Sequence, residues 1–319
     1  MYARVFGMKW FSKIDMRRAY RSLVASENTR RVCAFRTPSS TKYPFHTWAF
    51  RSTPDGLANL PGDYSYFIQK ALSPQSRKCV IQHIDDLLIA SPDLETHLAD
   101  IEAVFTDLMA SNFMIAITKF EPFKREVSFL GHVLNGKTLW IPEERKSYFN
   151  SLKPPTTRKE LLSLLGVSGY MAHFVDSYHL KTGPLFDALK GKKENQKLSL
   201  DEVQMKSFEE LRESIKKAEK LYIIDFEKTT YMECDASLSG VGSVIYQERY
   251  DSNYPPEQNP RRDIIQYASR RFSVTESLHH TSLEKEAMSV LISAKTHFYY
   301  LFNSIQAVIK TDLKSLITL

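Results

Sequence analysis

Residues 79–91, CVIQHIDDLLIAS, place two adjacent carboxylates between two apolar runs. The runs at 79–81 and 87–90 are short and rich in aliphatic and β-branched side chains, which predicts two β-strands. Asp85 and Asp86 fall where the chain must reverse, and aspartate tolerates turn geometry well. The stretch therefore predicts a β-hairpin whose tip carries two carboxylates.

The tip has two interpretations. Two like charges this close repel each other, and one carboxylate would take up a proton unless a cation is present. Mg²⁺ is a suitable cation, because it takes oxygen ligands and keeps waters for a substrate phosphate. A solvated Asp-Asp turn is the alternative, and the pair by itself does not separate the two. The rest of the sequence has to distinguish them.

Composition bounds the class of protein. The 319 residues suffice for two or three domains, and 43% hydrophobic with 25% charged residues is typical of globular chains. The three cysteines, Cys33, Cys79 and Cys234, form no CxxC pair, so we expect no disulfide framework and no structural zinc site. No apolar segment approaches the length of a membrane span and no signal peptide is evident, so we expect an intracellular protein without a membrane partner.

Charge is concentrated near the N-terminus. Residues 1–60 hold eleven Lys or Arg against three acids, within a chain of net charge +6. A basic region together with a hairpin whose carboxylates could bind a metal ion predicts a polyanionic partner such as nucleic acid. A solvated charged surface is the alternative.

A further carboxylate precedes this hairpin in the chain. In residues 10–24, WFSKIDMRRAYRSLV, a short strand is expected to end at Asp15, and apolar residues then recur at helical spacing. Asp15 would point into a cleft or cap the helix. We expect paired strands at 32–35 and 47–50, helices at 64–72 and 93–111, and strands at 113–119 and 127–134. The apolar face of the 93–111 helix is expected to comprise Leu94, Leu98, Ile101, Val104, Phe105 and Leu108.

The second half of the sequence predicts a helical segment followed by a segment of strands and one long helix. Residues 142–190 predict helices, one of them starting with Thr157 and Glu160 as a capping box, and 208–218 predict another. The polar run 190–197 predicts a boundary. Strands are then expected at 230–234 and 241–246, followed by a helix over 282–301 carrying Glu286 and a strand over 307–310 before Asp312.

Four segments occur in a telling order: FSKIDMRRAY at 11–20, TPDGLANLP at 53–61, HIDDLLIAS at 83–91 and KFEPFKREVSFLGHVL at 119–134. They resemble the palm motifs of reverse transcriptases, most closely those in the Pol polyprotein of gypsy-type LTR retrotransposons. RKELLSLLGVSGYMAHF at 158–174 is similar to the thumb of that family, and YMECDASLSGVGSVIYQ at 231–247 to the opening of its RNase H domain.

The resemblance implies a domain organisation. Residues 1–140 would form the palm, 141–195 a helical thumb, 196–225 a connecting segment and 226–319 an RNase H-like domain. The implied fold is an α+β palm, with an antiparallel sheet and helices, and a helical thumb. An α/β RNase H-like domain follows, and both the palm and this domain are expected to be truncated.

The resemblance also implies roles for single residues. Asp15, Asp85 and Asp86 would hold two Mg²⁺ (or Mn²⁺) ions for nucleotidyl transfer. The nucleotide and primer would meet a further set: Tyr20, which crowds the sugar 2′-carbon; the bend at Pro54, Asp55, Gly56 and Pro61; Lys119, which protonates the leaving pyrophosphate; and Leu130, Gly131 and His132, which grip the primer end. Without the resemblance, Tyr20 is equally well a buried aromatic residue and Lys119 a surface lysine.

The RNase H-like segment would carry its own metal ligands, Asp235, Glu286 and Asp312, again with two Mg²⁺ (or Mn²⁺) ions. Glu286 is preferred to Glu284, because residues 287–291 match the apolar stretch of the family. The implied partners are an RNA template, a DNA primer, an RNA–DNA hybrid and dNTPs. The implied location is the cytoplasm, in particles, or the nucleus; the sequence gives no oligomeric state.

The chain departs from the family pattern in four places. It begins just before the first palm motif and ends seven residues after Asp312, so we expect the fingers segment and the last RNase H elements to be missing. His83 stands where an aromatic Tyr or Phe is usual. Asp55 replaces an apolar or amide residue, which is unfavourable beside a polyanion unless a metal or an Arg screens it.

Three hypotheses remain open. The chain is a polymerase and RNase H fragment from a retroelement, with its activities retained or weakened, a non-catalytic nucleic-acid-binding remnant, or an unrelated α+β enzyme that uses Mg²⁺ phosphoryl chemistry. The third is disfavoured, since the sequence has no P-loop, kinase or Rossmann glycine pattern.

Overall fold

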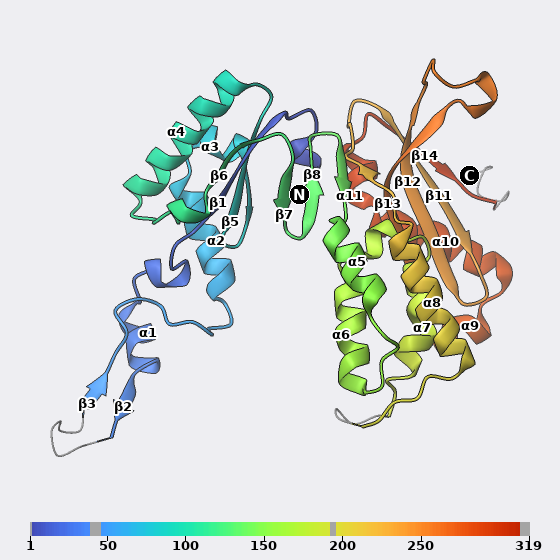
Figure 1. Ribbon diagram of the computed structural model, residues 1–319, viewed down its shortest axis with the longest axis horizontal. Helices are drawn as coiled ribbons and strands as arrows, with labels where there is room; N and C mark the ends of the chain where they lie inside the picture. The colour runs from blue at the N-terminus through green and yellow to red at the C-terminus, as the bar shows by residue number, and fades with distance from the viewer. Residues whose placement is uncertain (1, 39–45, 192–195, 313–319) are drawn as a thin grey trace. The chain divides into compact units, whose positions relative to one another are not determined.

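The computed structural model describes residues 2–38, 46–191 and 196–312 and divides the chain into two compact units, Met1–Phe129 and Leu130–Leu319 (Figure 1). Among these residues, no helix combines the length and the apolar character that crossing a membrane requires.

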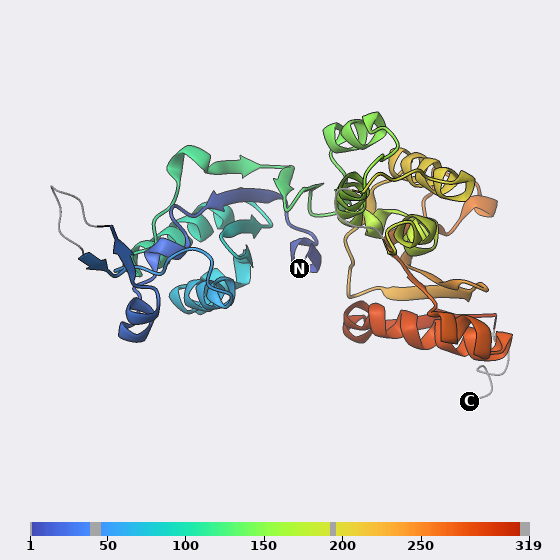
Figure 2. The same cartoon turned by 90° about the horizontal axis from the view of Figure 1, so that it is seen from below.

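The first unit is built on a four-stranded antiparallel sheet of order β4-β5-β1-β6. Its strands are β1 (Trp10–Asp15), β4 (Val80–His83), β5 (Asp86–Ser91) and β6 (Glu121–Lys124). The helices α2 (Leu60–Ala71), α3 (Pro74–Cys79) and α4 (Leu94–Ala110) lie on one side of it (Figure 2). Ile14, Leu87 and Ile89 of the sheet share a buried core with Ile68 and Val104 of the helices. This core holds β1 and β5 side by side.

Smaller elements complete the unit: η1 (Tyr2–Val5), η2 (Tyr20–Ser22), α1 (Glu27–Val32), β2 (Phe35–Thr37), β3 (His46–Trp48), η3 (Ile117–Lys119) and β7 (Val127–Phe129). The predicted strand pair exists, but β2 starts later than expected, because Ser26 caps α1 by accepting a hydrogen bond from Thr29 N. The predicted helix after Asp15 is wrong. Arg18 has φ 53, which interrupts helical geometry, and a single 3₁₀ turn follows.

The strand predicted at 113–119 is also largely wrong. Ile115 makes only an isolated bridge to Met16, and Ile117–Lys119 forms a 3₁₀ turn. The strand that joins the sheet is β6, which follows this turn and pairs with β1.

Helix α4 confirms the predicted helix and most of its predicted apolar face, since Val104 and Leu108 are fully buried and Ile101 and Phe105 pack against the core. The prediction fails in the first turns of the helix. Asp93 caps it by accepting from Thr96 N at 2.8 Å. Leu94 and Leu98 are 43% and 52% exposed, whereas His97 and Asp100 are buried. The two polar residues are buried because Ser12 and Ser91 of the sheet offer them hydrogen-bond partners at 2.6–2.8 Å.

The second unit begins with a small sheet in which β9 (Thr138–Trp140) pairs with both β8 (His132–Leu134) and β10 (Leu221–Tyr222). Around it pack α5 (Glu143–Ser151), α6 (Arg158–Gly169), η4 (Ala172–Phe174), α7 (Tyr178–Asp187) and α8 (Glu202–Lys216). The predicted capping box is half confirmed. Thr157 accepts from Glu160 N, but Glu160 accepts from Thr156 N rather than from its cap residue. The predicted boundary at 190–197 lies partly outside the described residues.

A second sheet follows, of order β13-β12-β11-β14. Its strands are β11 (Thr229–Ala236), β12 (Gly240–Arg249), β13 (Arg261–Arg271) and β14 (Gln306–Lys310), and η5 (Pro256–Gln258), α9 (Val274–His279), α10 (Ser282–Thr296) and α11 (Phe298–Asn303) accompany them. The pairs are antiparallel except β11 with β14, which is parallel. Figure 2 shows this sheet between α10–α11 on one face and the helical segment, made of α5 to α8, on the other.

Candidate functional site

The three carboxylates expected in the first unit lie at one end of its sheet. Asp15 is the last residue of β1, and its Cα partner across the ladder is Asp86, the first residue of β5. The β4–β5 hairpin closes through Ile84 and Asp85, with Ile84 at φ 54. The predicted hairpin is therefore confirmed, with one change: Asp85 is at the turn, while Asp86 opens a strand opposite Asp15.

Electrostatics make this end of the sheet suitable for a cation. Burial raises the pKa of Asp86, and repulsion from Asp85 and Asp15 raises it further, against the opposing influence of Lys13 and His83. A bound cation would relieve this repulsion, so the donor set fits a divalent ion with oxygen ligands.

The carboxylates nevertheless do not converge on one point in this structure. Among the described residues, no three His, Cys, Asp or Glu side chains gather closely enough to hold a metal ion. One oxygen of Asp15 is instead engaged by Lys119, whose Nζ donates to Oδ2 at 3.2 Å. Lys119, predicted to protonate the leaving pyrophosphate, thus contacts Asp15, a predicted metal ligand, directly.

Tyr20 follows Asp15 by five residues and is half-buried in η2. Its ring stands edge-on to Tyr64, with the centroids 5.6 Å apart and the planes at 82°. Thr53 Oγ1 donates to Tyr20 O at 2.6 Å, which ties this turn to the segment that leads into the predicted bend. Gly56 in the bend has φ 98, a conformation that glycine adopts without strain.

Asp55, the unexpected acid of the bend, is screened by an arginine. Arg21 Nη2 lies 2.9 Å from Asp55 Oδ2, and both side chains are more than half exposed. Sequence reasoning did not identify Arg21, because 34 residues separate it from Asp55 and no periodic pattern links the two.

Leu130 and Gly131 both have left-handed φ, 49° and 82°. A Cβ on Gly131 would lie 2.6 Å from Nη1 of Arg145, so this guanidinium group covers the glycine backbone. The following His132 stacks on Phe174 with the ring centroids 5.3 Å apart. The segment predicted to grip a primer is thus fixed by residues of α5 and η4.

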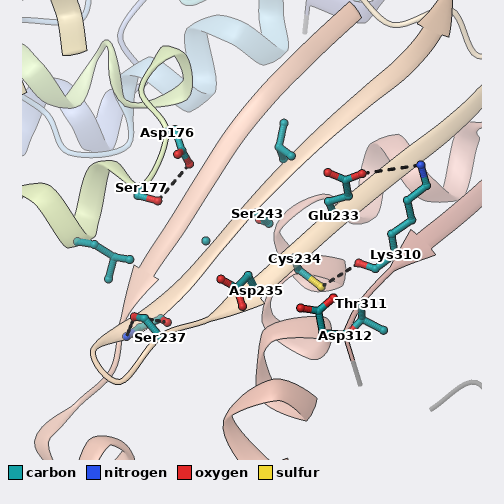
Figure 3. A pocket seen from close by; sticks show the side chains of 14 residues that line it. Asp176, Ser177, Glu233, Cys234, Asp235, Ser237, Ser243, Lys310, Thr311 and Asp312 are labelled. Atoms are coloured by element: carbon teal, nitrogen blue, oxygen red, sulfur yellow. Dashed lines mark hydrogen bonds and ion pairs between the residues drawn. The ribbon is translucent and has the colours of Figure 1, made fainter. Parts of the chain in front are cut away.

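The second carboxylate set lies at one edge of the second sheet. Because β11 and β14 are parallel neighbours, the residues that follow their paired positions Glu233 and Lys310 emerge together. Asp235 and Asp312 accordingly line one pocket of about 660 Å³ and lie next to each other in Figure 3.

Glu286 on α10 lies near enough for the charges of Asp235 and Asp312 to act on it, although among the described residues the three side chains do not gather closely enough to hold a metal ion. Burial raises its pKa, and the charges of Asp235 and Asp312 raise it further. Its Oε2 is buried without a hydrogen-bond partner. An orphaned carboxylate oxygen beside two other carboxylates again fits a divalent cation.

The opposite wall of this pocket comes from the helical segment. Asp176, Ser177 and Leu180 line it, and Ser177 Oγ donates to Asp176 Oδ1 at 3.1 Å (Figure 3). Ser177 has φ 55, the backbone conformation that turns the chain into α7. Sequence reasoning did not identify Asp176, because it lies in a segment predicted to be a separate domain.

Comparison with known proteins identifies a family for each of two parts of the chain. Residues 3–134 match the family described as reverse transcriptase (RNA-dependent DNA polymerase), and residues 200–309 match the RNase H-like domain found in reverse transcriptase. Reverse transcriptase and RNase H families generally use divalent metals.

Relatives matched over most of this chain include two transposon polyproteins. The retrovirus-related Pol polyprotein from transposon 297 of Drosophila melanogaster is 27% identical over 92% of this chain and 26% of its own length. The Tf2-3 polyprotein of Schizosaccharomyces pombe is 26% identical over 99% of this chain and 22% of its own length. The chain thus spans about a quarter of the length of these curated relatives.

A solved structure is similar as well. The foamy viral protease-reverse transcriptase in complex with RNA/DNA hybrid has a TM-score of 0.73 and 21% identity, over 94% of this chain and 38% of that one. This likeness shows the fold. The predicted combination of an antiparallel sheet with helices, followed by an RNase H-like domain, is confirmed.

Proposed function

Because this chain belongs to the retrotransposon Pol polyproteins, with a reverse transcriptase domain and an RNase H-like domain, we propose that it is an RNA-directed DNA polymerase with RNase H activity. Both reactions are metal-assisted phosphoryl transfers. The pairing of Asp15 with Asp86 at the end of the sheet, beside Asp85 on the hairpin, is the observation that carries the proposal.

The proposed domain limits are those of the sequence: palm 1–140, thumb 141–195, connecting segment 196–225 and RNase H-like domain 226–319. Helices α5 to α7 supply the proposed thumb. The proposed partners are an RNA template, a DNA primer, an RNA–DNA hybrid and dNTPs, by analogy with the hybrid bound to the foamy viral enzyme.

In the polymerase, Asp15, Asp85 and Asp86 would hold two Mg²⁺ (or Mn²⁺) ions. When bound, these ions would lower the pKa of the attacking hydroxyl and neutralise charge on the triphosphate. Lys119 already donates to Asp15. This position places Lys119 beside the carboxylates that would hold the ions, where it would be the proton donor to the leaving pyrophosphate.

The neighbouring residues would position the nucleotide and the primer. Tyr20 presents its ring to the sugar and excludes a 2′-hydroxyl. Asp55 and Gly56 form the bend beside the incoming nucleotide, with the Asp55 charge screened by Arg21. Leu130 and Gly131 hold the primer end. Both residues have a left-handed backbone, and the Arg145 guanidinium group covers Gly131, which supports this placement.

In the RNase H-like domain, Asp235, Glu286 and Asp312 would hold the second pair of ions. The buried, unpartnered Oε2 of Glu286 supports its inclusion. The substrate would be the RNA strand of a hybrid, whose 2′-hydroxyl distinguishes it from DNA.

Primer extension tests the polymerase. The chain is expected to extend oligo(dT) on poly(rA) with dTTP and Mg²⁺, and to stop when EDTA is added. An Asp85→Asn, Asp86→Asn double variant is expected to bind the hybrid and not extend it. Extension by this variant at the parental rate would contradict the assignment of the site.

A second candidate function, nucleic-acid binding without catalysis, is favoured by the open arrangement of the carboxylates and by the basic residues of 1–60. It predicts hybrid binding that weakens steeply with salt, because released counterions drive such binding. Binding without any extension would select this function, and extension would exclude it.

A further inference from the structure

Tyr64 on α2 is fully buried between two other aromatic rings. Its ring meets Tyr20 edge-on at 5.6 Å on one side and Phe113 edge-on at 5.9 Å on the other. Edge-to-face contacts of this kind fix the relative orientation of the rings, in addition to excluding water. Tyr64 therefore forms the support against which the half-buried Tyr20 ring rests.

The hydroxyl of Tyr64 is unusual for a core tyrosine. It is buried and has no hydrogen-bond partner; the Ser22 hydroxyl is near it, but the two do not form a bond of normal geometry. Burial, together with the charges of Asp85 and Asp15, raises the pKa of this phenol, so it remains protonated. A phenylalanine would pack equally well without an unsatisfied hydroxyl.

The Tyr64 side chain thus meets the turn Tyr20–Ser22 at two points. Its ring contacts the Tyr20 ring, and its hydroxyl lies near Ser22. Thr53 holds the turn from another direction, because its Oγ1 donates hydrogen bonds to Tyr20 O and Leu23 O. The backbone of Tyr20 is therefore fixed by Thr53, while the direction of its ring is left to Tyr64.

We propose that Tyr64 is a positioning residue for sugar selection: by fixing the Tyr20 ring, it sets how closely that ring approaches the 2′-carbon of an incoming nucleotide. The inference rests on the proposed function. Its effect is on the choice between dNTP and rNTP, and the chemistry of transfer is left to the carboxylates.

Single-nucleotide primer extension separates this role from a purely structural one. The measured quantity is the ratio of kcat/KM for dTTP to kcat/KM for UTP on one primer-template. Loss of stability lowers both values together and leaves the ratio unchanged, whereas a displaced Tyr20 ring admits the 2′-hydroxyl and lowers the ratio.

Four variants complete the test. Tyr20→Val gives the ratio without the selecting ring. Tyr64→Leu is expected to lower the parental ratio by about fivefold, the size expected when one edge-to-face contact is lost. Tyr64→Phe keeps the ring and is expected to keep the ratio. Leu108→Ala, at another fully buried position of the same core, is expected to reduce activity without changing the ratio.

Two results would overturn the inference. An active Tyr64→Leu variant with the parental ratio would refute it and leave the polymerase assignment intact. A parent chain that does not extend at all would refute the proposed function, and the inference with it.

Discussion

Replacing His97 by phenylalanine tests the buried polar network that joins α4 to β1 and β5. His97 is fully buried, with Nε2 2.8 Å from Ser12 Oγ and Nδ1 2.8 Å from Ser91 Oγ. Ser91 donates onward to Asp100 at 2.6 Å, and Ser12 accepts from Phe123 N at 3.1 Å. Every member is satisfied if Ser12 donates to His97 and His97 Nδ1–H donates to Ser91.

The His97→Phe change keeps the size of the ring and removes both nitrogens. It breaks two hydrogen bonds and leaves the Ser12 hydroxyl as a buried donor without an acceptor. With a net value of about 1 kcal/mol for each bond and about 1–3 kcal/mol for an orphaned buried group, the expected loss is about 3 kcal/mol of unfolding free energy.

The pH dependence has a defined sign. Burial lowers the pKa of His97, although Asp100 opposes this. Below the unfolded value of about 6.5, the unfolded chain binds a proton that the folded chain does not, so this histidine makes the protein less stable as the pH falls. The difference in stability between the parent and His97→Phe is therefore expected to be larger at pH 7.5 than at pH 5.5.

Urea unfolding followed by circular dichroism at both pH values measures these quantities. His46→Phe is the control, because His46 is exposed in the same unit. A loss below about 1 kcal/mol in His97→Phe, or a difference from the parent that does not change with pH, would refute the argument for the network.

Three further predictions concern other positions. Glu286→Gln is expected to raise stability at pH 7 by at most about 0.5 kcal/mol, since its raised pKa makes the charged form unfavourable in the folded state. Thermal melts would show this gain disappear as the pH falls through the pKa, and hybrid cleavage would be lost. Arg21→Gln and Asp55→Asn are each expected to change stability by less than about 1 kcal/mol, because the pair is exposed, and urea titration checks this. Gly131→Ala is expected to cost about 1 kcal/mol in the same assay, and an added Arg145→Ala should not restore it, because the strain of φ 82 remains.

Local sequence patterns predicted the elements that carry the first site. The alternation of apolar runs with Asp85-Asp86 gave the hairpin, and the apolar residues before Asp15 gave β1. The pairing of Asp15 with Asp86 was not visible in these patterns, because register depends on contacts between distant strands.

The failures share a cause. The residues after Asp15 have helical spacing, but the left-handed backbone at Arg18 stops a helix there. The periodicity of α4 placed Leu94 and Leu98 in the core, whereas the hydroxyl groups of Ser12 and Ser91 made His97 and Asp100 the buried residues. In both places the chain has partners from elsewhere in the fold, since Arg17 N donates to Met114 O at 2.8 Å and Ser12 and Ser91 bond to the polar residues of α4. Local periodicity contains no information about such partners.

The most direct test of the carboxylate site is an anomalous difference map from crystals grown with a primer-template, dNTP and Mn²⁺. The expected result is an anomalous peak coordinated by Asp15 and Asp86, with Lys119 moved away from Asp15. A complex that contains both primer-template and nucleotide, but shows no anomalous peak at these carboxylates, would contradict the assignment.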